Sequence, residues 1–238
     1  MTHVWQTHLG EDVAYDPLYH DHARVEVASF IDEPPGLVLD VGCGAGATGR
    51  LIKQKFPGTR VIGIEHNPKA AARAREVLDE VICASLDSEE VSTHPDLARV
   101  DLVLLLDILE HLYDPWRSLL RLRESLATGT RILASVPNVR NLITLDGLAS
   151  GQWDYEANGV LDITHVRFFT RASLKQLFEE TGYTVVAMEP LSQRELVDRH
   201  VLLRSPGRLT TRSVSITFRD LEDLEDLYAL QYVIDARV

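Results

Sequence analysis

Short apolar runs alternate with helical patterns along most of the chain. The runs are rich in Val, Ile and Leu, and several contain hardly any polar residue. Strands that are buried on both faces have this composition, because neither face meets water. We therefore predict seven strands, at residues 37–41, 60–65, 81–84, 101–107, 131–136, 184–188 and 231–236.

The segments between these strands carry helix signals. Pro68 stands where a first helical turn tolerates proline, Asp114 and Thr170 are suitable N-caps, and Gly129 and Gly182 follow expected C-termini. Alternating strands and helices indicate an α/β fold, a Rossmann-like, seven-stranded, mostly parallel sheet with helices on both faces. The predicted helices cover residues 47–56, 68–78, 115–127, 171–181 and 221–228.

The length of 238 residues favours one sizeable domain with elaborations. We expect this domain at residues 37–238, preceded by an N-terminal lid or helical segment at 1–36, in which Tyr15, Tyr19 and Arg24 face the cleft. Residues 138–169 and 190–229 are longer than ordinary connections. Segments of that length inside a domain are usually lids or substrate-binding insertions.

Composition and charge exclude several classes of protein. With 45% hydrophobic and 25% charged residues the chain can bury a core, and it contains no apolar run long enough to span a membrane. The 36 acidic residues outnumber the 24 basic ones, which disfavours a nucleic-acid partner. Two cysteines cannot form a disulfide framework, and the first residues do not resemble a signal peptide, so we expect a cytoplasmic protein.

A glycine-rich loop follows the first predicted strand and opens a helix. Residues 42–49 contain four of the 14 glycines, and residues 44–49 (GAGATG) match the dinucleotide pattern GxGxxG. Glycines at this position let the backbone approach a ligand closely. Glu65, at the end of the second strand, can accept hydrogen bonds from ribose hydroxyls of either NAD or an S-adenosyl compound. The loop therefore predicts an adenosine ligand without choosing between them.

Asp40 changes this balance. A carboxylate at the end of the first strand repels a nearby diphosphate but attracts a ligand that carries an ammonium and a sulfonium. The string VLDVGCGAG at residues 38–46 resembles the first motif of class I S-adenosylmethionine-dependent methyltransferases. The resemblance extends to about Gly182 and is closest to the ubiquinone-biosynthesis-type and methionine-biosynthesis-associated branches. The string LQYVIDA at 230–236 resembles the last strand of these enzymes, which implies that this strand is antiparallel.

The resemblance also implies a set of S-adenosylmethionine-binding residues. The segment SLD at 85–87 matches the family's adenine-binding segment, and DILEHLYDP at 107–115 matches the segment that lines the methionine part of the cofactor. His66 departs from the apolar residue expected beside the adenine. The implied roles are the loop (Gly42, Cys43, Gly44, Gly46), the methionine end (Asp40, Asp107, Ile108), the ribose (Glu65) and the adenine (His66, Leu86, Asp87).

Candidates for acceptor chemistry lie in the 138–169 insertion. The string LDITHVRFFT at 161–170 resembles a segment of methyltransferases in glycan and natural-product biosynthesis. His165 is the first candidate for a base or acceptor-orienting group, although it could instead brace the following helix, and His111 is the second. Arg167 could bind an acidic acceptor or pair with Asp162. The aromatic residues of the segment are Trp153, Tyr155, Phe168 and Phe169, of which we expect the two phenylalanines to pack in the core.

These observations predict an S-adenosylmethionine-dependent methyltransferase that acts on a small molecule, through an oxygen of a sugar, a quinone-like ring or a secondary metabolite. An NAD(P)-dependent oxidoreductase and a non-catalytic S-adenosylmethionine-binding protein are the alternatives. No metal is expected, because His20 and His22 would diverge on a helix and no third ligand is evident near them. We expect no nucleic-acid or membrane partner, and a homodimer stays open.

Overall fold

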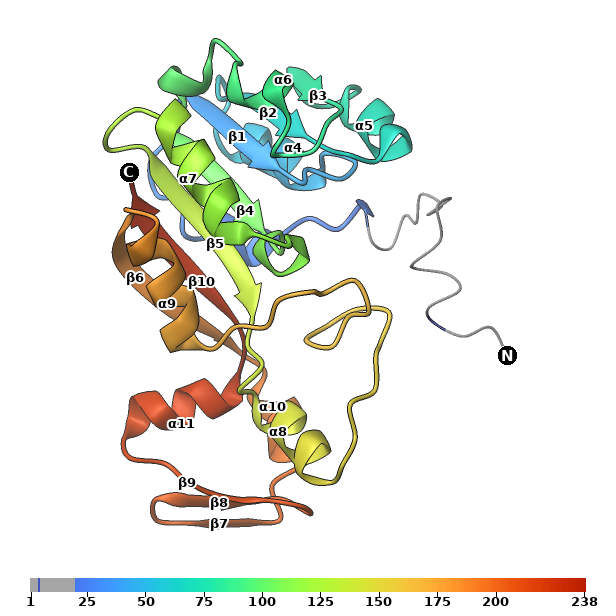
Figure 1. The fold of residues 1–238 in the computed structure, drawn as a ribbon, viewed down its shortest axis with the longest axis vertical. Helices are drawn as coiled ribbons and strands as arrows, with labels where there is room; N and C mark the ends of the chain where they lie inside the picture. Colours follow the sequence, from blue (N-terminus) through green and yellow to red (C-terminus); the bar gives the residue numbers. More distant parts are fainter. Residues whose placement is uncertain (1–3, 5–19) are drawn as a thin grey trace.

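The computed structural model describes Val4 and residues 20–238. Its main sheet has seven strands in the order β3-β2-β1-β4-β5-β10-β6 (Figure 1). The strands β1, β2, β3, β4 and β5 run parallel to one another. β10 lies antiparallel between β5 and β6, so the predicted Rossmann-like sheet with an antiparallel last strand is confirmed. The strands are β1 Leu37–Val41, β2 Arg60–Ile64, β3 Glu80–Ile82, β4 Leu102–Leu106, β5 Arg131–Pro137, β6 Thr184–Ser192 and β10 Ala229–Arg237.

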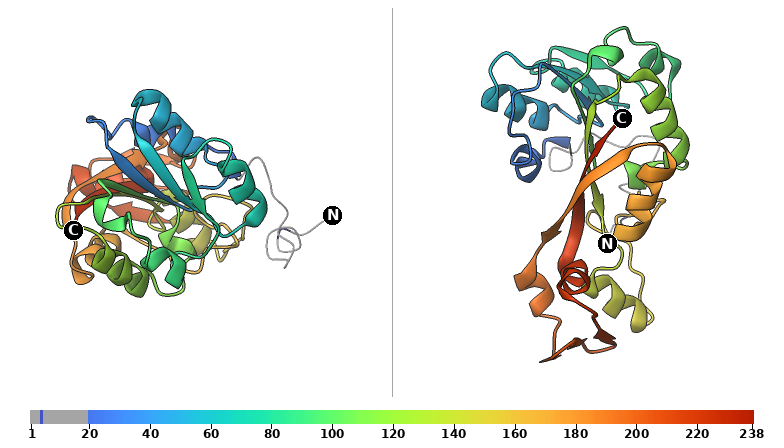
Figure 2. Two further views of the ribbon diagram at one scale, coloured as in Figure 1. Left: turned by 90° about the horizontal axis from the view of Figure 1, so that it is seen from above. Right: turned by 90° about the vertical axis from the view of Figure 1, so that its left-hand side faces the viewer.

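Helices lie on both faces of the sheet (Figure 2) and bury β1, β4 and β5, whereas the edge strand β6 stays partly exposed. Alternate residues of β1 enter two different cores: Val38 packs with Ile52 on one face, and Leu39 packs in the core that contains Leu119 on the other. This is why the strands read as almost wholly apolar in the sequence. Helices α3 Val25–Ala28, α4 Ala47–Lys55 and α5 Pro68–Ala74 cover one face, and α6 Glu89–Ser92, α7 Pro115–Ser125 and α9 Arg171–Glu180 cover the other.

Pairing between strands corrects several predicted boundaries. β3 ends at Ile82 because its partner β2 ends at Ile64, so the strand expected to reach Ala84 has no neighbour to pair with. β6 continues to Ser192, beyond the predicted Met188, because β10 pairs with it along that length. Within the described part of the chain, no helix combines the length and the apolar character needed to cross a bilayer.

The two long segments contain regular structure and pack on each other. They supply α8 Leu142–Ala149, α10 Arg194–Asp198 and α11 Leu221–Tyr228, together with a small antiparallel sheet of β7 Leu203–Ser205, β8 Arg208–Thr210 and β9 Ser215–Thr217. We call this group the accessory module; in Figure 1 it lies below the main sheet. Its core, separate from the other two, is formed by Leu142, Val197, Leu209, Leu227 and Tyr228.

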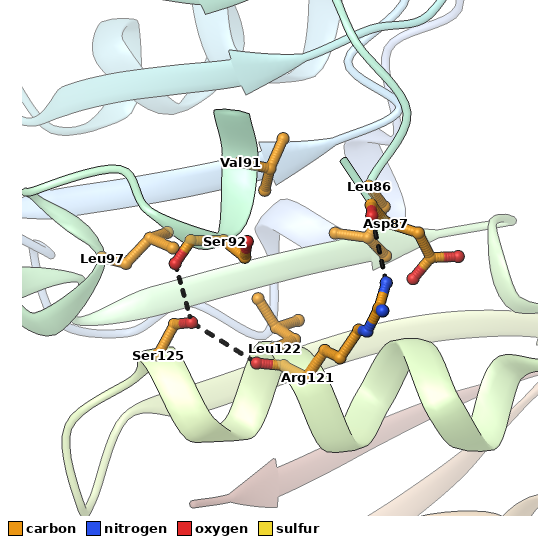
Figure 3. A pocket seen from close by; sticks show the side chains of 8 residues that line it. All are labelled: Leu86, Asp87, Val91, Ser92, Leu97, Arg121, Leu122 and Ser125. Atoms are coloured by element: carbon orange, nitrogen blue, oxygen red, sulfur yellow. Dashed lines mark hydrogen bonds between the residues drawn. The ribbon is translucent and has the colours of Figure 1, made fainter. Parts of the chain in front are cut away.

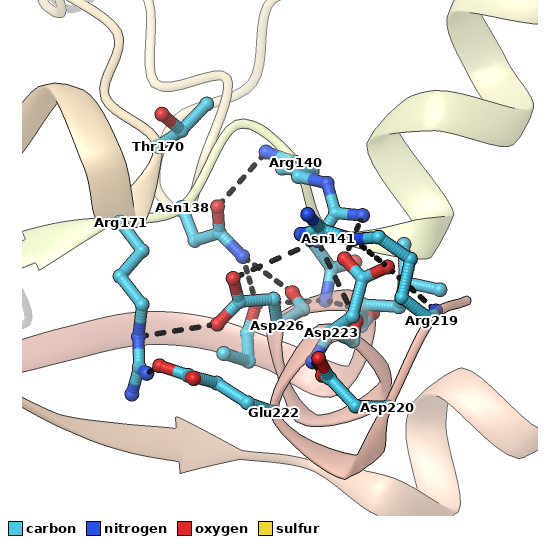
Figure 4. Close-up of polar contacts among 12 residues, drawn as sticks. Asn138, Arg140, Asn141, Thr170, Arg171, Arg219, Asp220, Glu222, Asp223 and Asp226 are labelled. Carbon is cyan, nitrogen blue, oxygen red and sulfur yellow. Dashed lines mark hydrogen bonds and ion pairs between the residues drawn. The ribbon is translucent and has the colours of Figure 1, made fainter.

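Polar contacts fasten the accessory module to the end of β5 (Figure 4). The buried Asn138 amide donates to the carbonyl oxygens of Asp226 and Ala229, at 2.7 and 2.9 Å. Arg140 pairs with Asp223 at 2.6 Å, and Arg171, at the start of α9, lies 3.3 Å from the Asp226 carboxylate. The position of α11 is therefore determined by the loop after β5 as well as by its apolar face.

A candidate cofactor and acceptor site

The glycine loop turns sharply between β1 and α4. Gly42, Gly44 and Gly46 adopt positive φ angles of 68°, 55° and 83°. The loop also lies tightly against its neighbours: a Cβ on Gly42 would clash with the end of the Ile108 side chain, and one on Gly44 would lie 2.5 Å from the backbone carbonyl oxygen of His20. Glycine is thus required both by conformation and by space.

Glu65 joins this loop to the end of β2. One carboxylate oxygen accepts the backbone N–H of Gly44 at 2.9 Å, and the other accepts that of Asn67 at 2.7 Å. The side chain is only 5% exposed. Each oxygen keeps a further lone pair, because an ionised carboxylate can accept about four hydrogen bonds. Glu65 can therefore hold the loop and a ligand hydroxyl at the same time.

Further carboxyl groups line the same edge of the sheet. Asp40 is buried, and burial together with repulsion from Glu65 raises its pKa to about 7. Asp107, just after β4, has a φ of 54° and accepts a hydrogen bond from Ser135 at 2.9 Å. Acidic groups at the ends of β1, β2 and β4 thus surround the glycine loop, an arrangement that suits a cationic ligand and disfavours a diphosphate.

The N-terminal segment from His20 to Arg24 lies on the glycine loop. The His20 carbonyl accepts the N–H of Ala45 at 2.9 Å, and the N–H of Arg24 donates to the Thr48 hydroxyl at 3.1 Å. The Arg24 guanidinium forms an ion pair with Asp107. This part of the predicted lid therefore contacts the glycine loop, whereas Tyr15 and Tyr19 lie outside the described residues.

The adenine-binding residues implied by the resemblance lie on the loop after β3 and beyond β2. Asp87 accepts a hydrogen bond from Ser118 at 2.9 Å, and the His66 side chain is 84% exposed, with Nδ1 3.3 Å from Glu65. Leu86 and Asp87 also border a narrow pocket between α6 and α7 (Figure 3). In that view the Asp87 carboxylate lies on the side away from Leu97. The loop thus offers one carboxylate next to an apolar surface.

A second group of polar side chains follows Asp107 in a short 3₁₀ turn, Leu109–His111. Glu110 is 1% exposed, and neither of its carboxylate oxygens has a hydrogen-bond partner among the described residues. Burial raises its pKa to about 8. The rings of His111 and His165 lie 4.7 Å apart, and His165 Nε2 is 3.9 Å from Glu110. The two candidate catalytic histidines are thus brought together beside a buried carboxyl group.

Backbone hydrogen bonds bring His165 to this turn. The N–H groups of Val166 and Arg167 both donate to the Glu110 carbonyl, at 2.9 and 3.0 Å. Burial lowers the pKa of both histidines, that of His111 to about 4. Both rings are therefore neutral near pH 7, which leaves one nitrogen of each ring able to accept a hydrogen bond or to bind a cation.

The sequence analysis also made predictions for the charged and aromatic neighbours of His165 in the 138–169 insertion, and only some of them are confirmed. The Asp162–Arg167 pair is not formed: Asp162 accepts hydrogen bonds from Thr164, and Arg167 donates to backbone carbonyls. Phe169 packs in the main core as predicted. Phe168 instead makes edge contacts with the rings of Trp153 and His165, at 5.3 and 6.5 Å between centroids, so the core prediction for Phe168 is wrong.

Sequence reasoning placed Glu110, with its neighbour His111, near the cofactor but gave Glu110 no role of its own, and it missed Thr164 entirely. Thr164 Oγ1 lies 3.1 Å from His111 Nδ1 and donates to Asp162 at 2.6 Å. The only available signal was the position of Glu110, a charged residue directly before His111 and just after a buried strand.

The strand order with an antiparallel β10, the glycine loop after β1 and the acidic strand ends define the fold of the S-adenosylmethionine-dependent methyltransferases. Residues 14–188 match the methyltransferase-domain family, and the chain belongs to that family. A methyltransferase of this class from Archaeoglobus fulgidus superposes with a TM-score of 0.64 at 22% identity, covering 90% of this chain and 92% of that one.

Curated relatives match shorter stretches. Trans-aconitate 2-methyltransferase of Methylobacterium nodulans is 29% identical over 116 residues, which cover 49% of this chain and 42% of that enzyme. Isonocardicin synthase of Nocardia uniformis subsp. tsuyamanensis is 44% identical over 48 residues, covering 20% of this chain and 16% of that protein. The chain thus matches less than half of the length of these relatives.

Proposed function

We propose that this protein transfers the methyl group of S-adenosylmethionine to a small-molecule acceptor. The observation that carries the proposal is the ring of carboxyl groups around the glycine loop, which complements a ligand with an ammonium and a sulfonium. S-adenosylmethionine supplies an electrophilic methyl group bonded to its positive sulfur. The partial similarity to trans-aconitate 2-methyltransferases supports a small acceptor.

We assign the cofactor contacts by position along the sheet edge. Asp40 and Asp107 attract the ammonium, Glu65 accepts from the ribose hydroxyls, and Asp87 accepts from the adenine amino group. Arg24, which lies at Asp107, is the cation available for the methionine carboxylate. Gly42, Cys43, Gly44 and Gly46 form the loop, whose positive-φ glycines let the backbone approach the cofactor closely. The remaining contacts are assigned to His66, Leu86 and Ile108.

The acceptor lies next to the Leu109–His111 turn and the segment that carries His165. Neutral histidines near a buried carboxyl group can orient a hydroxyl acceptor and take up its proton, which favours oxygen over carbon as the methylated atom. Trp153 and Phe168 supply an aromatic edge at the same place. A sugar, a quinone-like ring or a secondary metabolite has the size and the hydroxyl groups that this site requires. The string DILEHLYDP supports a relationship to the ubiquinone-biosynthesis-type and methionine-biosynthesis-associated branches.

Thermal unfolding with each candidate cofactor tests the first part of the proposal. A ligand that binds only the folded state stabilises it, so S-adenosylhomocysteine at 100 times its Kd should add about 2.7 kcal/mol, whereas NAD should add nothing. Stabilisation by NAD alone would instead indicate an oxidoreductase. Incubation with labelled S-adenosylmethionine and a panel of hydroxylated acceptors tests the second part. Cofactor binding without transfer to any acceptor would indicate a non-catalytic binding protein.

A further inference from the structure

We propose that Glu110, His111 and His165 together bind a divalent transition-metal ion, with Zn²⁺ as the probe. One potential donor atom from each of the three side chains lies within 4.8 Å of the others. Of the residues that the structure describes, these are the ones that form a group of three or more His, Cys, Asp or Glu ligands at such spacing. The proposal replaces the expectation that no metal binds, which was directed at His20 and His22.

The hydrogen bonds leave the lone pair of each imidazole on Nε2. His165 Nδ1 lies 3.1 Å from the Val160 carbonyl, which can only accept, so Nδ1 carries the proton. The Thr164 hydroxyl donates to the Asp162 carboxylate at 2.6 Å and therefore accepts from His111 Nδ1 at 3.1 Å. Metal-binding histidines are commonly held in this way, with the second nitrogen donating to a carbonyl or to a group linked to a carboxylate.

Glu110 provides the second, independent observation. Its side chain is 1% exposed and both oxygens lack a hydrogen bond from the described residues. The nearest imidazole nitrogen, at 3.9 Å, is too far away for a hydrogen bond. A buried carboxyl group without a hydrogen-bond partner is costly, and Arg24, the nearby cation, pairs with Asp107. A metal ion among the three donors would compensate the carboxylate and use both imidazole lone pairs.

The donor set selects the kind of ion. Two imidazoles favour Zn²⁺ and related transition metals over Mg²⁺ and Ca²⁺, which prefer oxygen ligands. Tetrahedral Zn²⁺ with bonds of ~2.0–2.1 Å requires donor atoms roughly 3.4 Å apart, so donor atoms that are now up to 4.8 Å apart must approach each other by up to about 1.4 Å. Three protein ligands leave a fourth position open, as in catalytic zinc sites. That this position faces the methyl acceptor rests on the proposed function; metal binding itself does not.

Metal binding is measured directly, on untagged protein freed of metal with a chelator. Dialysis against Zn²⁺ followed by elemental analysis should give one equivalent per chain, and a chromophoric chelator should report its affinity. Co²⁺ in place of Zn²⁺ should give the visible absorption of a four-coordinate site. Glu110→Gln and His165→Gln should each weaken binding by more than about 100-fold, since each removes a ligand. Thr164→Val keeps all three ligands but frees the His111 ring, so it should weaken binding by about ten-fold.

His94→Gln is the matched control, because His94 also lies near a glutamate, Glu80 at 3.0 Å, but outside the cluster. It should bind Zn²⁺ like the unchanged protein. The proposal would be overturned if the protein bound no tight equivalent of Zn²⁺, which would mean that a proton on Glu110 takes the place of the metal. It would also be overturned if Zn²⁺ binding survived both Glu110→Gln and His165→Gln in folded protein. Calorimetry with S-adenosylhomocysteine on the same samples separates this outcome from failure of the proposed function, because the two ligands are titrated independently.

Discussion

Replacement of Glu65 by glutamine tests whether one carboxylate serves both the glycine loop and the ligand. In the structure its two oxygens accept the N–H groups of Gly44 and Asn67. In Glu65→Gln one of these oxygens becomes an NH₂ group, which cannot accept, so one N–H loses its partner. Loss of a hydrogen bond to a charged group costs about 1.5–3 kcal/mol.

Two separate measurements should show this loss. For a chain of this size, 1 kcal/mol shifts Tm by about 2–4 °C, so about 2 kcal/mol predicts a Tm about 4–8 °C lower without ligand. If a ribose hydroxyl also uses the carboxylate, the Kd for S-adenosylhomocysteine should rise by about ten- to a hundred-fold, since 1.4 kcal/mol corresponds to a factor of ten. Differential scanning calorimetry gives the first value and isothermal titration calorimetry the second.

Glu76→Gln is the matched control, because Glu76 is exposed just beyond α5 and should affect neither quantity. A lower Tm with unchanged Kd would show that Glu65 only braces the loop, and would refute its ribose-binding role. An unchanged Tm would contradict the contribution of the two backbone hydrogen bonds.

Three further predictions concern the same site and the accessory module. Gly44→Ala places a Cβ 2.5 Å from the His20 carbonyl, so the N-terminal segment should shift, which faster tryptic cleavage at Arg24 would reveal. The pKa of Asp40 is about 7 in the folded protein against an ordinary 3.8, so the unfolded chain loses this proton first and the free energy of unfolding should fall as the pH rises from 3.8 to about 7. As the pH rises through about 7, Asp40 ionises in the folded protein and the affinity for S-adenosylmethionine should increase. Asp40→Asn should flatten the dependence on pH of both the stability and the affinity. Arg140→Met removes the 2.6 Å partner of Asp223 and should lower the free energy of unfolding in urea by about 1–2 kcal/mol.

The Gly44 and Arg140 predictions each have a control on the same chain. Gly58 also has a positive φ, but a Cβ there meets nothing within 4 Å, so Gly58→Ala reports backbone strain alone. Lys175→Met removes an exposed helical ion pair and should change stability by less than about 0.5 kcal/mol. Equal cleavage in the two glycine variants, an Asp40→Asn profile as steep as that of the unchanged protein, or equal stability of the Arg140 and Lys175 variants would contradict the respective prediction.

The main sheet could be predicted from sequence because each strand carries its own signal. Val38 and Leu39 face opposite cores, so burial on both faces leaves a run that is apolar at every position. The ends of β3 and β6 could not be predicted, since they depend on where β2 and β10 stop. The core of the accessory module was also hidden, because Leu142 and Leu209 come from segments that show no common pattern.

The candidate site likewise contains residues whose positions could be predicted from the sequence and residues whose positions could not. Asp40, Glu65 and Asp107 stand at strand ends, where the order of the strands alone places them at one edge. His111 and Thr164 are 53 residues apart, and no local pattern indicates that they meet. Their approach depends on the backbone of Val166 and Arg167 pairing with the Glu110 carbonyl, a contact that is independent of those side chains.

The central position of β10 has a consequence for how the chain is made. In the main sheet β6 pairs only with β10. β6 can therefore join the sheet only after residues 229–237 have left the ribosome. Until then the edges of β5 and β6 both offer unpaired backbone groups to other strands. A nascent chain therefore depends on residues 229–237 for protection from aggregation, and loss of a few residues there would be more damaging than an equal loss from an outer strand.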